Sequence, residues 1–315
     1  MGYKLAGYDV IGNCEIDKAM NEIYLKNNHP KYNYLMDIRD FANLQDLPEE
    51  LYDLDILDGS PPCSTFSMAG SREKTWGVEK KFREGQKAQT LDDLFFEFIK
   101  VADKLKPKVV IAENVKGLLA GNAKGYVNEI VRKFDSAGYK VQVFLLNAAS
   151  MGVPQRRERA FVICQRKDLG FAKLNLNFNE KPILYKEIAS GGGPKIKEGT
   201  VGYERWLQRE QGEGCIGDAV KRVEGGKISG FTLRYAVLNK VAPTTTASMR
   251  CLRFDIPEYL SDADLVKIQT FPQDYDFLGT DPCYVCGMSV PPVMMANIAE
   301  QIYLQWFGGS ECLKK

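Results

Sequence analysis

Cys63 is the side chain in this sequence with the clearest setting for nucleophilic chemistry. It ends the run Ser60-Pro61-Pro62-Cys63, which follows a short apolar run at residues 54–57. Ligands in open α/β sheets bind at the carboxyl ends of strands, and the two prolines stiffen the approach to the thiol. A thiolate placed there can form a covalent bond with a substrate. The competing interpretation is a buried structural cysteine, the usual setting of a single thiol.

Glu113 is the carboxyl group that we expect to work beside this thiol. Glu113-Asn114-Val115 ends the apolar run at residues 108–112, so in a parallel sheet Glu113 and Cys63 emerge at the same edge. A carboxyl group in a pocket closed by a substrate has a raised pKa and can hold a proton. Alternatively, Asn114 with the nearby Lys116 forms a helix N-cap.

Two arginines follow in Gln155-Arg156-Arg157-Glu158-Arg159, just before an apolar strand-like run at residues 160–164. Because alternate residues of a strand point the same way, Arg157 and Arg159 are predicted to share one face. Two guanidinium groups on one face suit a phosphate or the polar edge of a base. A solvated charged surface is the alternative for such a run.

Acidic residues also follow the first predicted strand and a short apolar run after it. Glu15-Ile16-Asp17 follows the first, and Asp37-Ile38 follows Tyr34-Leu35-Met36. Carboxylates at such positions of nucleotide-binding sheets take ribose hydroxyls.

A long polar segment at residues 71–89 begins just after Cys63, and its Arg and Lys residues suit a lid on a phosphate backbone. Four of these basic residues are candidate DNA contacts: Arg72, Lys74, Lys80 and Lys81. Cys283 and Cys286 have the spacing of half a metal site, but no second such pair accompanies them, so we expect no bound metal.

The elements that must position these residues alternate between strand and helix. Strands are predicted at residues 8–14, 54–57, 108–112, 141–146 and 160–164, and helices at 18–28, 91–105 and 126–137. This alternation is typical of βαβ units and predicts an α/β fold with a mixed, mostly parallel sheet. After about residue 169 the sequence becomes rich in Gly, Thr, Lys and Arg, and an amphipathic helix follows at residues 291–306.

The length of 315 residues favours two domains. The formal charge of +1 neither indicates nor excludes a nucleic-acid partner, and the eight scattered cysteines are expected to be reduced thiols. The sequence shows neither a signal-peptide core nor an apolar run long enough to cross a membrane. We therefore expect a cytoplasmic monomer.

Taken in order, these segments make the chain similar to the cytosine carbon-5 DNA methyltransferases. The resemblance covers nearly the whole chain. Its motifs are Glu15-Ile16-Asp17, Asp37-Ile38, Ser60-Pro61-Pro62-Cys63, Leu94-Phe95-Phe96, Glu113-Asn114-Val115, Gln155-Arg156-Arg157-Glu158-Arg159, Ile268-Gln269-Thr270-Phe271-Pro272 and Gly287-Met288-Ser289-Val290-Pro291-Pro292.

The resemblance implies a Rossmann-like class I methyltransferase fold with S-adenosylmethionine as cofactor. A catalytic and cofactor-binding domain would cover residues 1–184, a smaller target-recognition domain residues 185–285, and a returning C-terminal helix residues 286–315. The implied catalytic residues are Cys63 as nucleophile, Glu113 at ring nitrogen 3 of a flipped cytosine, and Arg157 and Arg159, which orient base and nucleophile. The implied cofactor residues are Glu15, Ile16, Asp37, Ile38, Pro62, Leu94, Ser289 and Val290, and Thr244, Thr245 and Thr246 would read DNA bases.

The implied reaction is methyl transfer to carbon 5 of a cytosine in duplex DNA, in a restriction–modification system with or without a partner endonuclease. Thiolate addition at carbon 6 would activate carbon 5, and the base must leave the helix to be reached. One alternative is an RNA methyltransferase that acts on tRNA through the same residues. The other is a DNA-binding relic with impaired cofactor binding.

Two features depart from the family pattern. The family's first strand and most of its Phe-x-Gly-x-Gly turn have no counterpart, and Met1-Gly2-Tyr3-Lys4-Leu5-Ala6-Gly7-Tyr8 resembles the end of that motif. The true start upstream, a separate peptide, or poor cofactor binding would each account for this; we favour the upstream start and expect weak S-adenosylmethionine binding by residues 1–315. Met288 stands where the family has Asn beside the cofactor.

Overall fold

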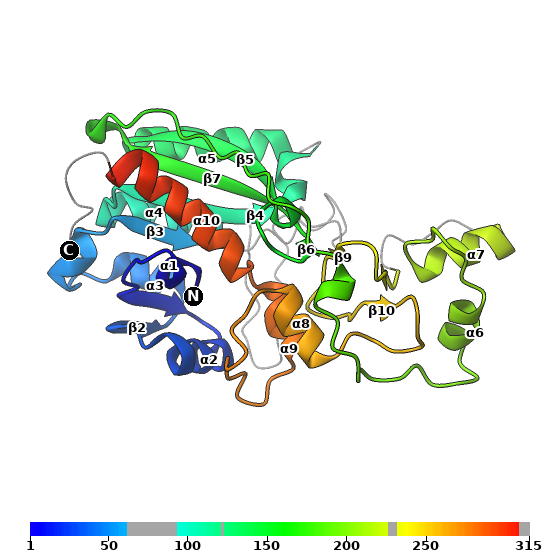
Figure 1. The fold of residues 1–315 in the computed structure, drawn as a ribbon. Helices are drawn as coiled ribbons and strands as arrows, with labels where there is room; N and C mark the ends of the chain where they lie inside the picture. The colour runs from blue at the N-terminus through cyan, green and yellow to red at the C-terminus, as the bar shows by residue number, and fades with distance from the viewer. Residues whose placement is uncertain (62–92, 121–122, 226–231, 309–315) are drawn as a thin grey trace. The chain divides into compact units, whose positions relative to one another are not determined.

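The computed structural model describes residues 1–61, 93–120, 123–225 and 232–308 (Figure 1). The chain forms two compact units. The first, here called the sheet unit, comprises Val10–Leu146, Glu158–Leu176 and Ile302–Lys315. The second, the loop-rich unit, comprises Met1–Asp9, Asn147–Arg157 and Asn177–Gln301. The predicted boundaries at residues 184 and 285 remain a prediction.

The strands of the sheet unit form two sheets. Strand β1 (Gly12–Glu15) pairs in parallel with β2 (Tyr32–Leu35). A second sheet has the order β3-β4-β7-β5, in which β3 runs parallel and β7 antiparallel to β4. Its strands are β3 (Ile56–Gly59), β4 (Val109–Val115), β5 (Tyr139–Asn147) and β7 (Glu158–Arg166). The predicted α/β fold with a mixed sheet is therefore confirmed.

Helices follow the strands of this unit, and short acidic side chains begin two of them. Asp17 accepts hydrogen bonds from the backbone N–H groups of Ala19 and Met20 and so caps α2 (Lys18–Asn28). Asp37 caps α3 in the same way. The remaining helical segments of the unit are α3 (Ile38–Asn43), η1 (Glu49–Tyr52), α4 (Leu94–Leu105), η2 (Lys116–Leu119), α5 (Lys124–Ser136), η5 (Lys167–Leu169) and the π-turn η7 (Tyr303–Phe307).

Helices α4 and α5 cover one face of the four-stranded sheet (Figure 1). Their apolar stripes, which include Phe98 on α4 and Phe134 on α5, pack against Val110 of β4 and Cys164 of β7. Val110 and Cys164 are paired across the two strands, so they face the same way. Each large apolar side chain buried here contributes roughly 1.5–3 kcal/mol, and this core holds the ends of β3 and β4 in place.

The strand predicted at residues 54–57 is real but shifted, and it is only half-buried as β3 (Ile56–Gly59). Among the described strands β4 is its only partner, so one edge of β3 lacks the cover of a neighbouring strand. Gly59 ends this strand against the ring of Phe98, where a Cβ would lie 2.4 Å from Cε2. Only glycine lets α4 approach the sheet this closely.

The loop-rich unit has short elements around two small apolar cores. Strand β6 (Gln155–Arg156) pairs in parallel with β9 (Ala242–Pro243), and β8 (Tyr235–Ala236) pairs in parallel with β10 (Leu252–Arg253). Its helical segments are α1 (Gly2–Leu5), η4 (Ala148–Ser150), η6 (Tyr185–Glu187), α6 (Val201–Leu207), α7 (Ile216–Glu224), α8 (Asp262–Ile268), α9 (Pro282–Met288) and α10 (Pro292–Ile302), which ends one residue beyond the unit.

The C-terminal helix predicted at residues 291–306 is present with a change of geometry. Helix α10 ends at Ile302 and continues as the π-turn Tyr303–Phe307. Within the described ranges, no helix combines the length and the apolar character needed to cross a lipid bilayer.

Candidate active site

Glu113 and Arg159 form an ion pair on neighbouring strands of the sheet unit. Phe161 of β7 lies opposite Glu113 of β4, so Arg159, two residues earlier, is its diagonal neighbour on the same face. The Arg159 Nε lies 2.9 Å from Glu113 Oε1, and the two side chains are only 16% and 12% exposed. Burial lowers the pKa of Arg159, while the adjacent Glu113 carboxylate opposes that shift. The alternative interpretation, a solvated charged surface, is therefore wrong for Arg159.

Asn114 ties the end of β4 to the segment after β3. In the parallel register Gly59 lies beside Ala112, and two residues further along each strand Pro61 comes beside Asn114. The buried Asn114 side chain donates from Nδ2 to the Pro61 carbonyl at 3.1 Å, and its Oδ1 accepts from the Val115 N–H at 2.9 Å. The alternative interpretation of Asn114 as a helix N-cap is wrong, since η2 begins after Val115.

Several predicted site residues lie outside the described residues. These are Pro62 and Cys63 and the four basic residues of the predicted lid, Arg72, Lys74, Lys80 and Lys81. Their roles remain predictions.

Arg157 is the largest of the fully buried side chains, at 1% exposure. Its Nη1 donates to the carbonyl of Thr245 at 3.2 Å and its Nη2 to the carbonyl of Gly287 at 2.9 Å. Arg157 precedes β7, which begins at Glu158, so the alternation that was used to place it on one face with Arg159 does not reach it. Through its two hydrogen bonds Arg157 holds the segments of Thr245 and Gly287 together within the loop-rich unit.

The predicted cofactor carboxylates end adjacent strands. Glu15 is the last residue of β1, and Asp37 follows β2, whose register is fixed by pairing of Glu15 with Leu35. Burial raises the pKa of Glu15, although backbone N–H groups of Asp17 and Ile16 partly offset the shift. The intervening Ile16 is 44% exposed. Two carboxylates at one sheet edge suit hydroxyl and amino groups of a nucleoside.

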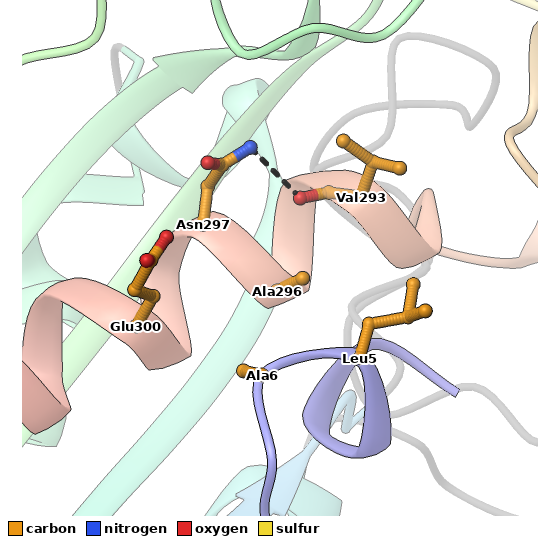
Figure 2. A pocket seen from close by; sticks show the side chains of 6 residues that line it. All are labelled: Leu5, Ala6, Val293, Ala296, Asn297 and Glu300. Atoms are coloured by element: carbon orange, nitrogen blue, oxygen red, sulfur yellow. Dashed lines mark hydrogen bonds between the residues drawn. The ribbon is translucent and has the colours of Figure 1, made fainter. Parts of the chain in front are cut away.

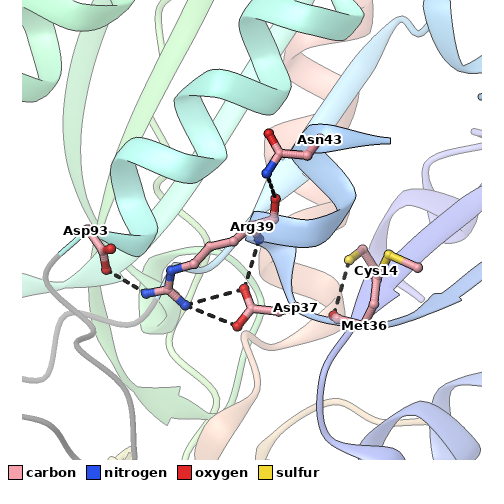
Figure 3. Close-up of polar contacts among 6 residues, drawn as sticks. All are labelled: Cys14, Met36, Asp37, Arg39, Asn43 and Asp93. Atoms are coloured by element: carbon pink, nitrogen blue, oxygen red, sulfur yellow. Dashed lines mark hydrogen bonds and ion pairs between the residues drawn. The ribbon is translucent and has the colours of Figure 1, made fainter. Parts of the chain in front are cut away.

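Apolar residues flank these carboxylates. Ile38, the first residue of α3, is partly buried against both cores of the sheet unit, and Leu94, the first residue of α4, is buried. Arg39 connects the two helix starts, since it pairs with both Asp37 and Asp93 (Figure 3). Sequence reasoning missed Arg39 because its partner Asp93 is 54 residues away.

Ser289 and Val290, also predicted to contact cofactor, lie in the loop-rich unit after α9. The Ser289 hydroxyl donates to the Val285 carbonyl at 2.6 Å, and its own carbonyl accepts from Nε2 of Gln269 at 2.7 Å. Gln269 in turn accepts from the buried Gln155 at 2.7 Å. Gln155 and Gln269 were recognised in the sequence only as motif members; nothing in their spacing predicted that they pair.

The predicted base-reading residues differ in exposure. Thr245 is 1% exposed, whereas Thr246 is exposed and Thr244 half-buried. Thr244 Oγ1 donates to the Arg156 carbonyl at 2.6 Å, and Thr246 Oγ1 to the Met249 carbonyl at 3.3 Å. Thr244 and Thr246 are thus the members of this run with surface to offer a partner.

Cys283 and Cys286 are buried in an apolar core together with Cys251. Burial is the main cause that raises the pKa of Cys286 and of Cys251 to about 12, which makes these thiols poor nucleophiles. In the part of the chain that the structure describes, no group of three or more His, Cys, Asp or Glu side chains could hold a metal ion.

A cavity of about 320 Å³ lies between the end of α1 and one stripe of α10, and none of the residues that line it is a predicted site residue (Figure 2). Asn297 on this stripe donates to the carbonyls of Val293 and Met151. The lining residues are Leu5, Ala6, Val293, Ala296, Asn297 and Glu300.

Comparison with known proteins gives one consistent result. A family model described as C-5 cytosine-specific DNA methylase matches residues 1–304. The type II methyltransferase M.FnuDI of Fusobacterium nucleatum is 36% identical over 187 residues, which cover 59% of this chain and 48% of that protein. The chain thus spans about half the length of that relative. The type II methyltransferase M.DdeI of Desulfomicrobium norvegicum is 33% identical over an alignment that covers 97% of this chain and 85% of that protein.

Among solved structures, a prophage-encoded protein of E. coli assigned as a DNA modification methyltransferase has a TM-score of 0.66 at 20% identity. The alignment covers 96% of this chain and 94% of that chain. This likeness supports the fold.

Proposed function

The chain belongs to the C-5 cytosine-specific DNA methylase family, and from this premise we propose that it methylates carbon 5 of a flipped-out cytosine in a specific sequence of duplex DNA. The nucleophile in this proposal is Cys63. The observation that carries it furthest is the largely buried Glu113–Arg159 pair, at the sheet edge where Asn114 holds Pro61, two residues before Cys63.

The chemistry needs a nucleophile because carbon 5 of cytosine is too electron-poor to take a methyl group directly. The Cys63 thiolate forms a bond to carbon 6, which makes carbon 5 electron-rich. S-adenosylmethionine supplies the electrophilic methyl group when it is bound. Loss of the proton from carbon 5 then lets the bond between Cys63 and carbon 6 break, which regenerates the thiolate.

Glu113 and Arg159 have complementary roles in this proposal. A hydrogen bond from protonated Glu113 to ring nitrogen 3 stabilises the charge that develops on the ring. A guanidinium stabilises the ionised form of a carboxylate, so the Glu113–Arg159 pair must loosen as the base enters. Arg159 is then available to orient the base. Arg157, buried between the Thr245 and Gly287 carbonyls, contributes by holding the segments around the base.

The residues of the sheet edge fit a nucleoside cofactor. Glu15 offers its carboxylate to the ribose hydroxyls, Asp37 to the adenine amino group, and Ile16 and Ile38 offer apolar surface. Leu94, which is buried at the start of α4, is assigned to the pocket on the family resemblance. We assign Pro62, Ser289 and Val290 to the same pocket on the family resemblance. A cytosine in a duplex cannot reach Cys63 and Glu113 without flipping out of the helix.

The partner in this proposal is double-stranded DNA bound by a monomer. Thr244 and Thr246 supply hydroxyls for base edges, and Arg72, Lys74, Lys80 and Lys81 supply charge for phosphates. The type II methyltransferases among the relatives support a place in a restriction–modification system, with a cognate endonuclease as a further partner.

Transfer of a labelled methyl group tests the proposal. The full chain is incubated with labelled S-adenosylmethionine and either duplex DNA of mixed sequence or bulk tRNA. We expect label in DNA, located at cytosines of one sequence context, and no label with Cys63→Ala. A duplex containing 5-fluorocytosine should trap wild-type protein covalently. Label in tRNA alone would contradict the DNA assignment, and retained turnover in Cys63→Ala would contradict the covalent mechanism.

A further inference from the structure

We propose that Arg39 is a positioning residue of the cofactor site, which fixes the Asp37 carboxylate so that it discriminates an amino-bearing purine. The inference rests on the proposed function, in which Asp37 meets the adenine of the cofactor. It adds a residue that makes no contact with the cofactor itself and acts through its hold on Asp37 and on the start of α4.

The geometry around Arg39 is a bridge between two helix starts (Figure 3). Its Nη1 lies 3.1 Å from Asp37 Oδ2 and 3.3 Å from Oδ1, and its backbone N–H donates to Oδ1 at 2.8 Å. Its Nη2 lies 2.7 Å from Asp93 Oδ1. One guanidinium therefore spans the N-cap residue of α3 and the N-cap residue of α4.

The Asp93 side chain accepts from Arg39 and does not cap the helix that it precedes. An aspartate at an N-cap normally accepts from the first backbone N–H groups of its helix, yet the Asp93 side chain makes no capping hydrogen bond to α4. Its carboxylate is turned to Arg39 instead. Arg39 thus also fixes the position of Leu94, the next residue, which the proposed function assigns to the cofactor pocket.

The hydrogen bonds from Arg39 limit how many further hydrogen bonds the Asp37 carboxylate can accept. An ionised carboxylate can accept about four hydrogen bonds. In the described structure Arg39 makes two to Oδ1, from its backbone N–H and Nη1, and one to Oδ2, also from Nη1. The remaining position on Oδ2 suits one N–H donor, such as the exocyclic amino group of adenine. Without the Arg39 side chain the carboxylate keeps only the backbone N–H bond to Oδ1, Oδ2 loses its guanidinium donor, and Asp37 and Asp93 repel each other.

The charge balance supports the bridge. Partial burial lowers the pKa of Arg39, but the contacts with Asp93 and Asp37 outweigh burial and raise the pKa above its ordinary value. The side chain of Arg39 is 27% exposed and that of Asp37 is 23% exposed, whereas that of Asp93 is 48% exposed. Water therefore screens the Arg39–Asp37 ion pair less than it screens the Arg39–Asp93 ion pair.

The test compares two nucleoside thioethers that differ at one group. S-adenosylhomocysteine carries the amino group, and S-inosylhomocysteine carries an oxygen at that position. Equilibrium dialysis measures both affinities for the wild-type chain, Arg39→Met and Arg39→Lys. The matched control is Arg166→Met, which removes a partly buried arginine that pairs with an aspartate two residues away in the sequence, as Arg39 does (Arg166 Nε–Asp168 Oδ1, 2.8 Å). Its backbone N–H donates to the carbonyl of Lys108, which directly precedes β4. Arg166 therefore lies beside the beginning of that strand, whereas Glu113 lies near its carboxyl end.

We expect the wild-type chain to prefer the adenosyl compound by about tenfold, the size of one good hydrogen bond to a charged group. Arg39→Met should reduce that preference to less than about threefold, Arg39→Lys should retain part of it, and Arg166→Met should leave it unchanged. A milder variant, Asp93→Asn, should weaken binding of both compounds about threefold, and urea unfolding shows which variants fold.

The outcomes separate the inference from the function on which it rests. If wild type binds the adenosyl compound and Arg39→Met keeps the same preference, the positioning role of Arg39 is wrong while the cofactor assignment stands. If wild type binds neither compound, the cofactor assignment falls, and this inference falls with it. If a folded Asp93→Asn variant binds both compounds as wild type does, the Arg39–Asp93 ion pair does not contribute to cofactor binding.

Discussion

Arg159 and Glu113 sit diagonally across an antiparallel strand pair, with 2.9 Å between Nε and Oε1 and little exposure of either side chain. An ion pair in this setting makes each partner depend on the other, because removal of one leaves a nearly buried charge without compensation. The pair therefore links the stability of the sheet edge to the proposed chemistry there.

Replacement of Glu113 by Gln should reduce methylation by at least about 100-fold, since the proposed proton donor is lost. It should also lower the free energy of unfolding by about 2 kcal/mol, because Arg159 loses its partner. Single-turnover methylation and urea unfolding measure the two effects. Lys116→Met is the control: it breaks an exposed pair with Glu158 (3.0 Å) and should change stability by less than about 0.5 kcal/mol. Full activity in Glu113→Gln would exclude Glu113 from the reaction.

Asn114→Asp should slow methyl transfer while the affinity for cofactor changes little. The substitution replaces the Nδ2 donor to the Pro61 carbonyl by an acceptor, so two oxygens face each other and the segment leading to Cys63 loses its anchor. We expect a fall in kcat of about tenfold to 100-fold, measured under saturating S-adenosylmethionine. An unchanged kcat would show that this anchor is dispensable.

Glu15 should make stability depend on pH in an unusual direction. Its pKa is raised in the folded protein by burial, so above its ordinary pKa the folded state binds more protons than the unfolded state. Stability therefore falls as pH rises through the window between the unfolded and the folded pKa. Glu15→Gln keeps an acceptor for the Asp17 N–H and removes the charge.

This variant should be more stable than wild type at pH 7.5 and equal to it below about pH 4, and it should bind S-adenosylmethionine less well. Urea titrations at several pH values measure the stability difference. A variant less stable than wild type at neutral pH would contradict the burial argument.

Gly287→Ala should disturb the run that carries Thr244 and Thr246. A Cβ at Gly287 would lie 2.2 Å from the backbone nitrogen of Ala247 and 2.3 Å from the carbonyl carbon of Thr246, and backbone atoms cannot yield as a flexible side chain would. We expect a loss of about 2 kcal/mol or more together with weaker DNA binding. Gly202→Ala within α6, whose Cβ would meet Thr200 Oγ1 at 3.9 Å, should instead stabilise by about 0.5–1 kcal/mol. The same sign for both variants would refute the steric argument.

The helices were the part of the fold most readily predicted from sequence. Residues 18–28 form α2 as expected because Asp17 gives a strong N-cap. The limits of the strands were harder to predict: the apolar strand predicted at residues 54–57 is β3 at Ile56–Gly59, which is only half-buried and has one strand partner among the described residues. Burial of a strand depends on which strands flank it, and that is decided by chain segments distant in sequence.

The site was predictable in its residues and much less in its contacts. Glu113 and Arg159 were both identified, but their pairing follows from β7 running antiparallel beside β4, which the apolar patterns do not reveal. Arg157 was placed with Arg159 by strand alternation, yet it precedes the strand and is buried between two carbonyls. Arg39 carried no sequence signal, since its bridge exists only when α3 and α4 are packed.

The pairing of β6 with β9 has a consequence for engineering recognition specificity. Gln155 and Arg156 form the strand that pairs with Ala242 and Pro243, and Arg157 supports the Thr245 carbonyl. In a chimera that takes only residues 185–285 from a relative, strand β9 would come from the relative, while its partner strand β6 would keep the sequence of the recipient protein. Transplantation of a foreign recognition module should therefore succeed more often when residues 147–157 are exchanged with it, as two gene fragments rather than one.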